Sequence, residues 1–210
     1  MRSAFLPFSP PLIGEEEIAE VIDTLHSDWI TTGPKVRRFE EEFAALLGAP
    51  AALALNSCTA ALHVALATLG IGAGDAVITT PMTFCSSVHV IEHVGARPIL
   101  VDVEPDTLNI DPVKIAEAVE TFNVKRETCN VRAIMPVHLY GHPCEMDTIL
   151  DIARQYDLAV VEDAAHALPA KYKGRFIGQD PDQNNTQYAT RNTQYATRNT
   201  DHVSRLTCFS

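Results

Sequence analysis

The sequence lacks several features that would place it in familiar classes of protein. It has no apolar run near the ~20 residues that a membrane-spanning helix needs, and its first residues include no apolar stretch of signal-peptide length. Basic residues are few, 16 against 27 acidic ones, for a net charge of −11. Nucleic-acid binding requires basic surfaces. We therefore expect a soluble, cytoplasmic protein that binds neither nucleic acid nor membranes.

Paired cysteines and a metal-binding motif are also missing. The five cysteines are scattered and include no CxxC pair, so we expect reduced thiols in the cytosol. Two histidine pairs, His89 with His93 and His138 with His142, have the spacing of zinc-binding helices. The first pair lacks the glutamate of an HExxH motif, and a glycine and a proline disfavour a helix at the second. We expect no metal site.

Apolar segments of strand length alternate with helical patterns through most of the chain. Strands are predicted at residues 51–55, 76–79, 98–101, 133–137 and 159–161. Helices are predicted at residues 13–26, 34–47, 59–69, 83–94, 112–119 and 145–156. This alternation predicts βαβ units and a three-layer α/β/α fold with a mostly parallel sheet. Functional side chains of such a sheet gather at the carboxyl ends of its strands.

Near its end the chain contains a tandem repeat of low complexity. The heptad NTQYATR occupies residues 185–191 and again 192–198, and a third copy begins after it. The repeat has no apolar a and d positions, which argues against a coiled coil. We predict that residues 180–200 form a flexible insertion, because residues 203–210 are again rich in strand-forming residues.

Three segments that follow predicted strands carry residues that could take part in ligand binding or catalysis. Residues 56–61, NSCTAA, open a helix with small and hydroxyl side chains, which suits either an anion at the helix N-terminus or an ordinary N-cap by Ser57 or Thr59. Phe84 suits either a stack on a planar ligand or the core. Asp163 suits binding of a metal, polarisation of a water, pairing with a protonated ring nitrogen, or capping of a helix.

Six segments in a fixed order carry a resemblance to a known family. They are WITTGPKVRRF (29–39), NSCTAAL (56–62), TPMTF (80–84), DVEPDTLNID (102–111), PVHLYG (136–141) and VEDAAHA (161–167). Together they resemble the DegT/StrS-type sugar aminotransferases, which use pyridoxal 5'-phosphate (PLP) and have the aspartate-aminotransferase-like fold. The resemblance implies that residues 1–210 belong to the large domain of a homodimeric enzyme that transfers an amino group, usually from glutamate, to a nucleotide-linked keto sugar.

The resemblance further implies where the phosphate of PLP, or of its amine form pyridoxamine 5'-phosphate (PMP), would bind. Ser57, Cys58 and Thr59 match the phosphate-binding turn of the family, which acts mostly through backbone amides and a hydroxyl. Ser210 matches a serine that also binds the phosphate. A phosphate at a helix N-terminus agrees with the physical expectation from residues 56–61.

For the cofactor ring the resemblance implies three residues. Phe84 matches the aromatic side chain that stacks on the pyridine ring, and Asp163 matches the acid that pairs with the pyridine nitrogen. His166 matches a position beside the ring and its phenolic oxygen, and is the expected catalytic residue of the chain. A buried carboxylate would keep the ring nitrogen protonated, which the cofactor needs in order to act as an electron sink.

The sequence departs from the family at its end. In the family, the segment that resembles LTCFS (206–210) continues for a few residues to the lysine that binds the cofactor covalently, the Schiff-base lysine. Lys171 and Lys173 lie just after the Asp163 motif and do not replace it. We therefore expect a truncated chain that is inactive alone. A non-catalytic PLP- or PMP-binding protein and a decayed fragment are the alternatives.

Overall fold

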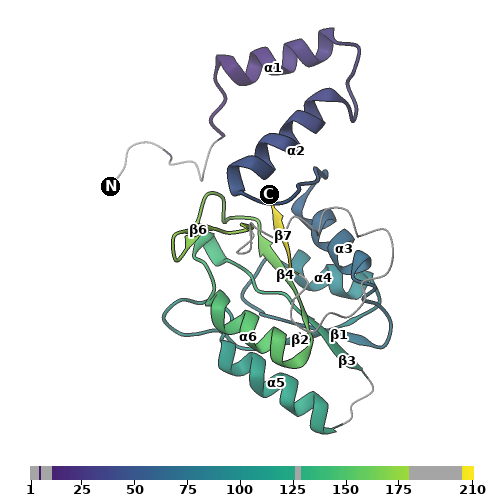
Figure 1. Cartoon of the computed structure of the whole chain (residues 1–210), viewed down its shortest axis with the longest axis vertical. Helices are drawn as coiled ribbons and strands as arrows, with labels where there is room; N and C mark the ends of the chain where they lie inside the picture. Colours follow the sequence, from purple (N-terminus) through teal and green to yellow (C-terminus); the bar gives the residue numbers. More distant parts are fainter. Residues whose placement is uncertain (1–4, 6–10, 126–128, 180–204) are drawn as a thin grey trace.

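The computed structural model of the chain describes residues 5, 11–125, 129–179 and 205–210. The predicted insertion at residues 180–200 lies outside the described residues. A single sheet with helices on both faces forms the body, and two further helices extend from it at the N-terminal end (Figure 1). No helix in the described ranges has both the length and the apolar character required to cross a membrane.

Five parallel strands form the sheet, in the order β2-β1-β3-β4-β7. Their bounds are β1 Asp75–Thr79, β2 Arg97–Leu100, β3 Asn130–Ile134, β4 Ala159–Ala164 and β7 Arg205–Phe209. A small antiparallel hairpin, β5 Lys171–Tyr172 with β6 Arg175–Phe176, lies outside this sheet. The predicted parallel sheet is confirmed.

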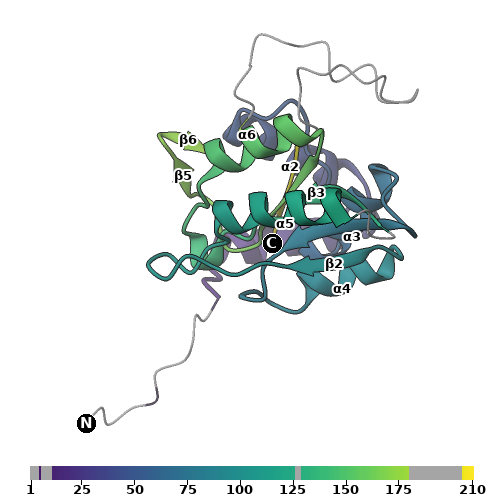
Figure 2. The same cartoon turned by 90° about the horizontal axis from the view of Figure 1, so that it is seen from below.

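Helices cover both faces of the sheet, as Figure 2 shows from below. Helices α3 (Cys58–Thr68) and α4 (Ser86–His93) pack on one face, and α5 (Pro112–Lys125) and α6 (Met146–Tyr156) on the other. Each face has its own apolar cluster, centred on Leu62, Val77 and Val161 beneath α3 and α4, and on Ile78, Ile149 and Val160 beneath α5 and α6. The predicted three-layer α/β/α fold is therefore confirmed.

The structure corrects the prediction of a strand at residues 51–55. This segment has no regular secondary structure, and Leu53 in it is 71% exposed. A strand exists only through hydrogen bonds to a neighbour, and within the described residues no strand pairs with this segment. The prediction rested on an apolar run of suitable length, and such a run does not show whether a neighbouring strand pairs with it.

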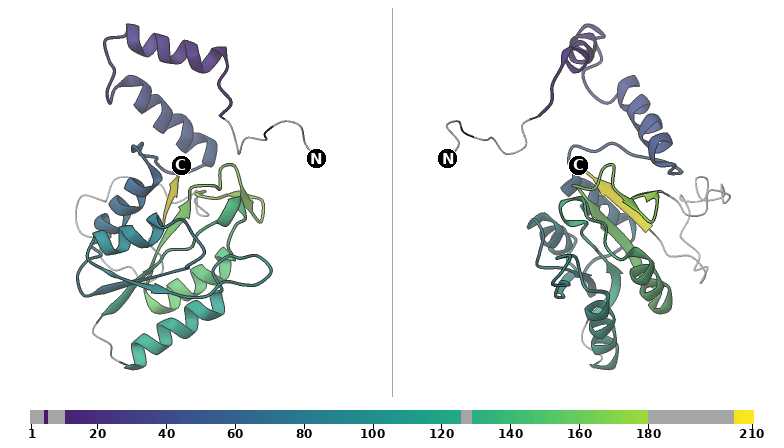
Figure 3. Two further views of the ribbon diagram at one scale, coloured as in Figure 1. Left: turned by 180° about the vertical axis from the view of Figure 1, so that it is seen from behind. Right: turned by 90° about the vertical axis from the view of Figure 1, so that its left-hand side faces the viewer.

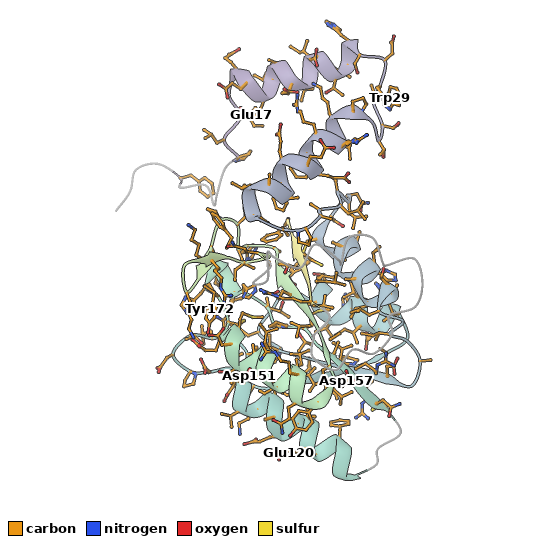
Figure 4. All side chains as sticks on the ribbon, in the orientation of Figure 1. Glu17, Trp29, Glu120, Asp151, Asp157 and Tyr172 are labelled. Carbon is orange, nitrogen blue, oxygen red and sulfur yellow. The ribbon has the colours of Figure 1, made fainter. Side chains whose placement is uncertain are left out.

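The two N-terminal helices, α1 (Glu15–His26) and α2 (Pro34–Leu47), agree with the predicted ones and project from the body (Figure 3). Ion pairs from Lys35 to Glu20 and Asp23 join them, and α1 has no buried residue. Trp29, labelled in Figure 4, lies in the loop between them. A Cβ atom at Gly33 would lie 2.3 Å from the Trp29 ring, so a larger residue here would displace the Trp29 side chain.

Candidate functional site

The site is organised by strand β4, which is longer than predicted. The sequence predicted a strand at residues 159–161 with the acidic pair after it, whereas β4 continues to Ala164 and contains both acids. Because successive side chains of a strand point to opposite faces, Asp163 lies on the α3/α4 side with Val161. Glu162 lies on the α5/α6 side with Val160. The two neighbouring carboxylates therefore have separate environments.

Asp163 is 5% exposed and accepts hydrogen bonds from three groups at the carboxyl end of the sheet. The Ser87 hydroxyl donates to Oδ2 at 2.7 Å, and the Ala165 amide donates to Oδ1 at 3.2 Å. The Cys58 thiol lies 3.8 Å from Oδ1. Three donors from separate segments hold this buried carboxylate in one orientation.

The N-terminus of α3 lies directly beside Asp163, because Cys58 is the first residue of the helix. Ser57 is the N-cap, and its Oγ accepts a hydrogen bond from the Ala60 amide at 3.1 Å, so the capping interpretation of this segment is confirmed for Ser57. Thr59 is exposed in the first turn. The first amides of a helix have no partner within the helix and favour an anion, so a phosphate could bind here as well.

Phe84 and Ser210 lie at the same edge of the sheet. Phe84 precedes α4 and its side chain is 75% exposed, so its interpretation as a core residue is wrong. Its carbonyl accepts the amide of Ser87, the partner of Asp163. Phe209 pairs with Ala164 across β7 and β4, which brings Ser210 beside the residues that follow Asp163.

His166 lies two residues beyond the end of β4 and is exposed. Its ring stacks on the Tyr140 ring, with 5.9 Å between the ring centroids and 2° between the planes. Thus the structure brings together, at one edge of the sheet, the seven residues predicted to hold the cofactor: Ser57, Cys58, Thr59, Phe84, Asp163, His166 and Ser210. The roles assigned to them remain predictions.

Glu162 forms a buried network on the other face of β4. Its carboxylate accepts hydrogen bonds from Arg205 Nε and Nη2 and from Thr207 Oγ1, and His138 Nε2 lies 3.0 Å from Oε2. The Cys144 amide donates to His138 Nδ1, so the proton of this ring lies on Nε2 and is donated to Glu162. Both nitrogens of His138 are therefore engaged, which leaves neither for a metal ion.

The network determines the charge state of Glu162. Burial by itself would raise the pKa of this carboxyl, but the hydrogen bonds from His138 and Arg205 outweigh burial and lower the pKa to about 2. Glu162 therefore stays ionised at neutral pH. It joins β4, which carries Asp163, to β7, which leads to Ser210.

The thiols near the site should react slowly. Burial, with Asp163 next in importance, raises the pKa of both Cys58 and Cys208 to about 12, so at pH 8 only about 10⁻⁴ of each is the reactive thiolate. Cys85 is exposed. We predict that iodoacetamide modifies Cys85 at least tenfold faster than Cys58 or Cys208, as measured by peptide mass spectrometry. Equal rates would contradict the buried placement of Cys58 beneath Asp163.

Sequence reasoning missed Ser87 and Tyr140 as neighbours of the predicted site residues, and gave Glu162 no role. Ser87 could have been suspected, because Thr83 and Ser87 have helical spacing at a predicted helix start, and their hydroxyls lie 2.7 Å apart. The stack of Tyr140 on His166 joins residues 26 positions apart. No local pattern in the sequence predicts such a contact.

Comparisons of the chain with known proteins agree on one family. The model of the DegT/DnrJ/EryC1/StrS aminotransferase family matches residues 11–186. The chain is 51% identical over 191 residues to the spore coat polysaccharide biosynthesis protein SpsC of Bacillus subtilis (strain 168), an alignment that covers 90% of this chain and 47% of SpsC. The chain thus spans about half the length of the curated relatives it matches.

Solved structures match the fold as well. The putative sugar aminotransferase Spr1654 from Streptococcus pneumoniae, in its PMP form, superposes with a TM-score of 0.75 at 39% identity, over 82% of this chain and 45% of Spr1654. NtdA from Bacillus subtilis, with bound PMP, superposes with a TM-score of 0.69 at 31% identity, over 84% of this chain and 41% of NtdA. Both are PMP-bound relatives of the described fold.

Proposed function

The chain belongs to the DegT/DnrJ/EryC1/StrS aminotransferase family, and from this premise we propose that the edge of the sheet around Asp163 binds PLP or PMP. The observation that carries the proposal is the buried Asp163 carboxylate, held by three donors beside the N-terminus of α3. A site of this kind offers an anion for a cationic ring nitrogen and a positive helix end for a phosphate.

The residues present fit the cofactor in their chemistry. Asp163 would pair with the ring nitrogen and keep it protonated, and the exposed ring of Phe84 is free of core packing and could cover one face of the pyridine. The first turn of α3, at Cys58 and Thr59, would hold the phosphate together with Ser210. When bound, the cofactor supplies an electron sink for bonds at the carbon that carries the amino group.

We further propose that the described residues bind the cofactor through non-covalent contacts. The lysines whose side chains the structure describes each have a partner elsewhere. Lys35 pairs with Glu20, Lys114 with Glu117, and Lys173 with Asp147, while Lys171 lies over the Phe176 ring. The described residues thus hold and orient the cofactor but offer no amine to form a bond with it or to move a proton at its carbon.

For the whole protein we propose transfer of an amino group from an amino acid, with glutamate as the donor, to a keto sugar carried on a nucleotide. The names of two relatives support this proposed reaction, because SpsC is a spore coat polysaccharide biosynthesis protein and Spr1654 is a putative sugar aminotransferase. We propose a homodimer as the assembly. We also propose that residues 1–210 correspond to the large domain of the family, with residues 180–200 as an insertion in it.

Comparing PMP with pyridoxamine, which lacks the phosphate, tests the proposed site. PMP is the better probe because PLP reacts with any exposed lysine. We expect a saturable shift of the PMP absorbance or saturable quenching of tyrosine fluorescence. The affinity for pyridoxamine should be at least 100-fold lower, because it cannot use the helix N-terminus. Equal affinities for the two amines would contradict a phosphate site at α3.

The sugar part of the proposal has its own test. A nucleotide-linked keto sugar should bind to the PMP-loaded chain and change the PMP absorbance, whereas the nucleoside diphosphate alone should leave that absorbance unchanged. Absence of any change with keto sugars of several nucleotides would contradict the proposed substrate class and leave the cofactor site standing.

A further inference from the structure

A turn between β3 and α6 presents one exposed aromatic ring to His166. Tyr140 is 78% exposed, yet its ring lies parallel to the His166 imidazole at 5.9 Å. An exposed aromatic ring has no apolar core to fix its position, so a flat stack on a neighbouring imidazole restricts both rings. The stack therefore holds the plane of His166 in the absence of any ligand.

The backbone of this turn is fixed independently of the stack. The Asn109 side chain is buried and joins the turn on both sides: its Oδ1 accepts the Leu139 amide, and its Nδ2 donates to the carbonyls of His142 and Pro143. The His138 amide donates to the Asp163 carbonyl. The turn is thus tied both to the β-strand of the proposed site and to a buried amide.

The local conformation of the turn is one that most side chains avoid. Tyr140 has a φ of 50°, in the left-handed region, which costs a non-glycine residue free energy and is tolerated where the surroundings require it. Gly141 follows with a φ of 83°, and a Cβ atom there would lie 2.9 Å from the His166 carbonyl oxygen. The turn therefore packs directly on the backbone of His166 as well as on its ring.

We propose that Tyr140 is a positioning residue that orients the His166 imidazole toward the bound cofactor. The inference rests on the function proposed above, in which His166 lies beside the pyridine ring and its phenolic oxygen. Tyr140 acts through His166: the stacked ring limits rotation of the imidazole, so the hydrogen-bonding edge of His166 is set before the cofactor arrives. A side chain restrained in advance loses less conformational freedom on binding.

The test is a double-mutant cycle on PMP affinity, with Tyr140→Asn, His166→Ala and the double variant. Asparagine tolerates the left-handed conformation and removes only the ring. We expect Tyr140→Asn to weaken PMP binding by about three- to tenfold. The affinity of Tyr140→Phe for PMP should stay within about twofold of wild type, because this variant keeps the ring. The double variant should bind PMP with the same affinity as His166→Ala alone. Lys173→Asn, at another left-handed position in the β5–β6 hairpin, is the matched control and should not weaken binding.

A second readout needs no cofactor. The His166 ring lies beside the aromatic ring of Tyr140, so the NMR signals of its ring protons should move in Tyr140→Asn and stay in place in Tyr140→Phe. Additive losses in the cycle, or unchanged affinity in Tyr140→Asn, would overturn the inference while leaving the proposed function intact. Failure of the wild-type chain to bind PMP would overturn the proposed function, and this inference with it.

Discussion

Replacing Glu162 with alanine is expected to lower the free energy of unfolding by about 3–5 kcal/mol. The substitution removes a buried carboxylate that accepts hydrogen bonds from Arg205, Thr207 and His138. These donors come from two other segments and converge on Glu162, so their partial desolvation would remain while this negative charge is lost. Urea-induced unfolding followed by circular dichroism measures the change.

A matched control is Glu117→Ala. Glu117 also forms an ion pair, with Lys114 at 2.8 Å, but both side chains are about half exposed, so its loss should cost less than about 1 kcal/mol. Similar effects of the two substitutions would contradict the account of Glu162 as the buried link between β4 and β7. The expected loss is a large share of a typical free energy of unfolding of about 5–15 kcal/mol. Protonation of Glu162 should therefore also lower the stability of the wild type measurably, so the pH dependence of that stability is a second measurement.

The lowered pKa of Glu162 fixes the sign of that pH dependence. A carboxyl whose pKa is about 2 in the folded chain and near its ordinary value of about 4.3 when unfolded contributes stability that is fully present above the unfolded value. The contribution is lost as the pH falls through about 2. We expect the unfolding midpoint of the wild type to decrease between about pH 4.5 and 2, and a midpoint that stays flat in this range would contradict the lowered pKa.

The second large effect is expected from Asp163→Asn, which should weaken PMP binding about 100-fold, or about 2.8 kcal/mol. Asparagine keeps the size of the side chain and can still accept from Ser87 or the Ala165 amide, so the fold should persist. It removes the negative charge that would pair with the ring nitrogen in a buried setting, where loss of one partner costs several kcal/mol.

Fluorescence or absorbance titration with PMP measures this loss, and the thermal midpoint of each variant shows whether the fold is retained. Asp147→Asn is the control, because Asp147 is about half exposed and pairs with Lys173. Wild-type affinity in a folded Asp163→Asn variant would contradict pairing of Asp163 with the ring nitrogen, and the cofactor would then have to bind elsewhere or in another orientation.

Much of the fold could be predicted because its signals are local. Pro34 and Gly48 mark the two ends of α2, and the alternation of apolar strands with helices requires a parallel sheet covered on both faces. The prediction of a strand at residues 51–55 was wrong because strand formation is not a local property. It depends on pairing with a neighbouring strand, which no local pattern specifies. Strand β4 was predicted too short, since two acidic residues do not resemble a buried strand until their partners from other segments are known.

The candidate site divides in the same way. Residues at the ends of strands, such as Asp163 and Phe84, could be predicted because the topology of a parallel sheet brings those ends together. The partners that orient them could not, since Ser87 meets Asp163 across 76 positions and Tyr140 meets His166 only through an unusual turn. The sequence thus predicted which groups gather at this edge of the sheet, but not which groups hold them in place.

Amide NMR spectra of the chain during titration with PMP test the central claim most directly. The account predicts saturable shifts of Cys58, Thr59 and Ala165, with no shift in the surface groove of about 380 Å³ between β2 and α5, lined in part by Val101 and Phe122. That groove lies on the α5/α6 face, whereas Asp163 is on the other. Shifts confined to the groove, or none at saturating PMP, would contradict a cofactor site at Asp163.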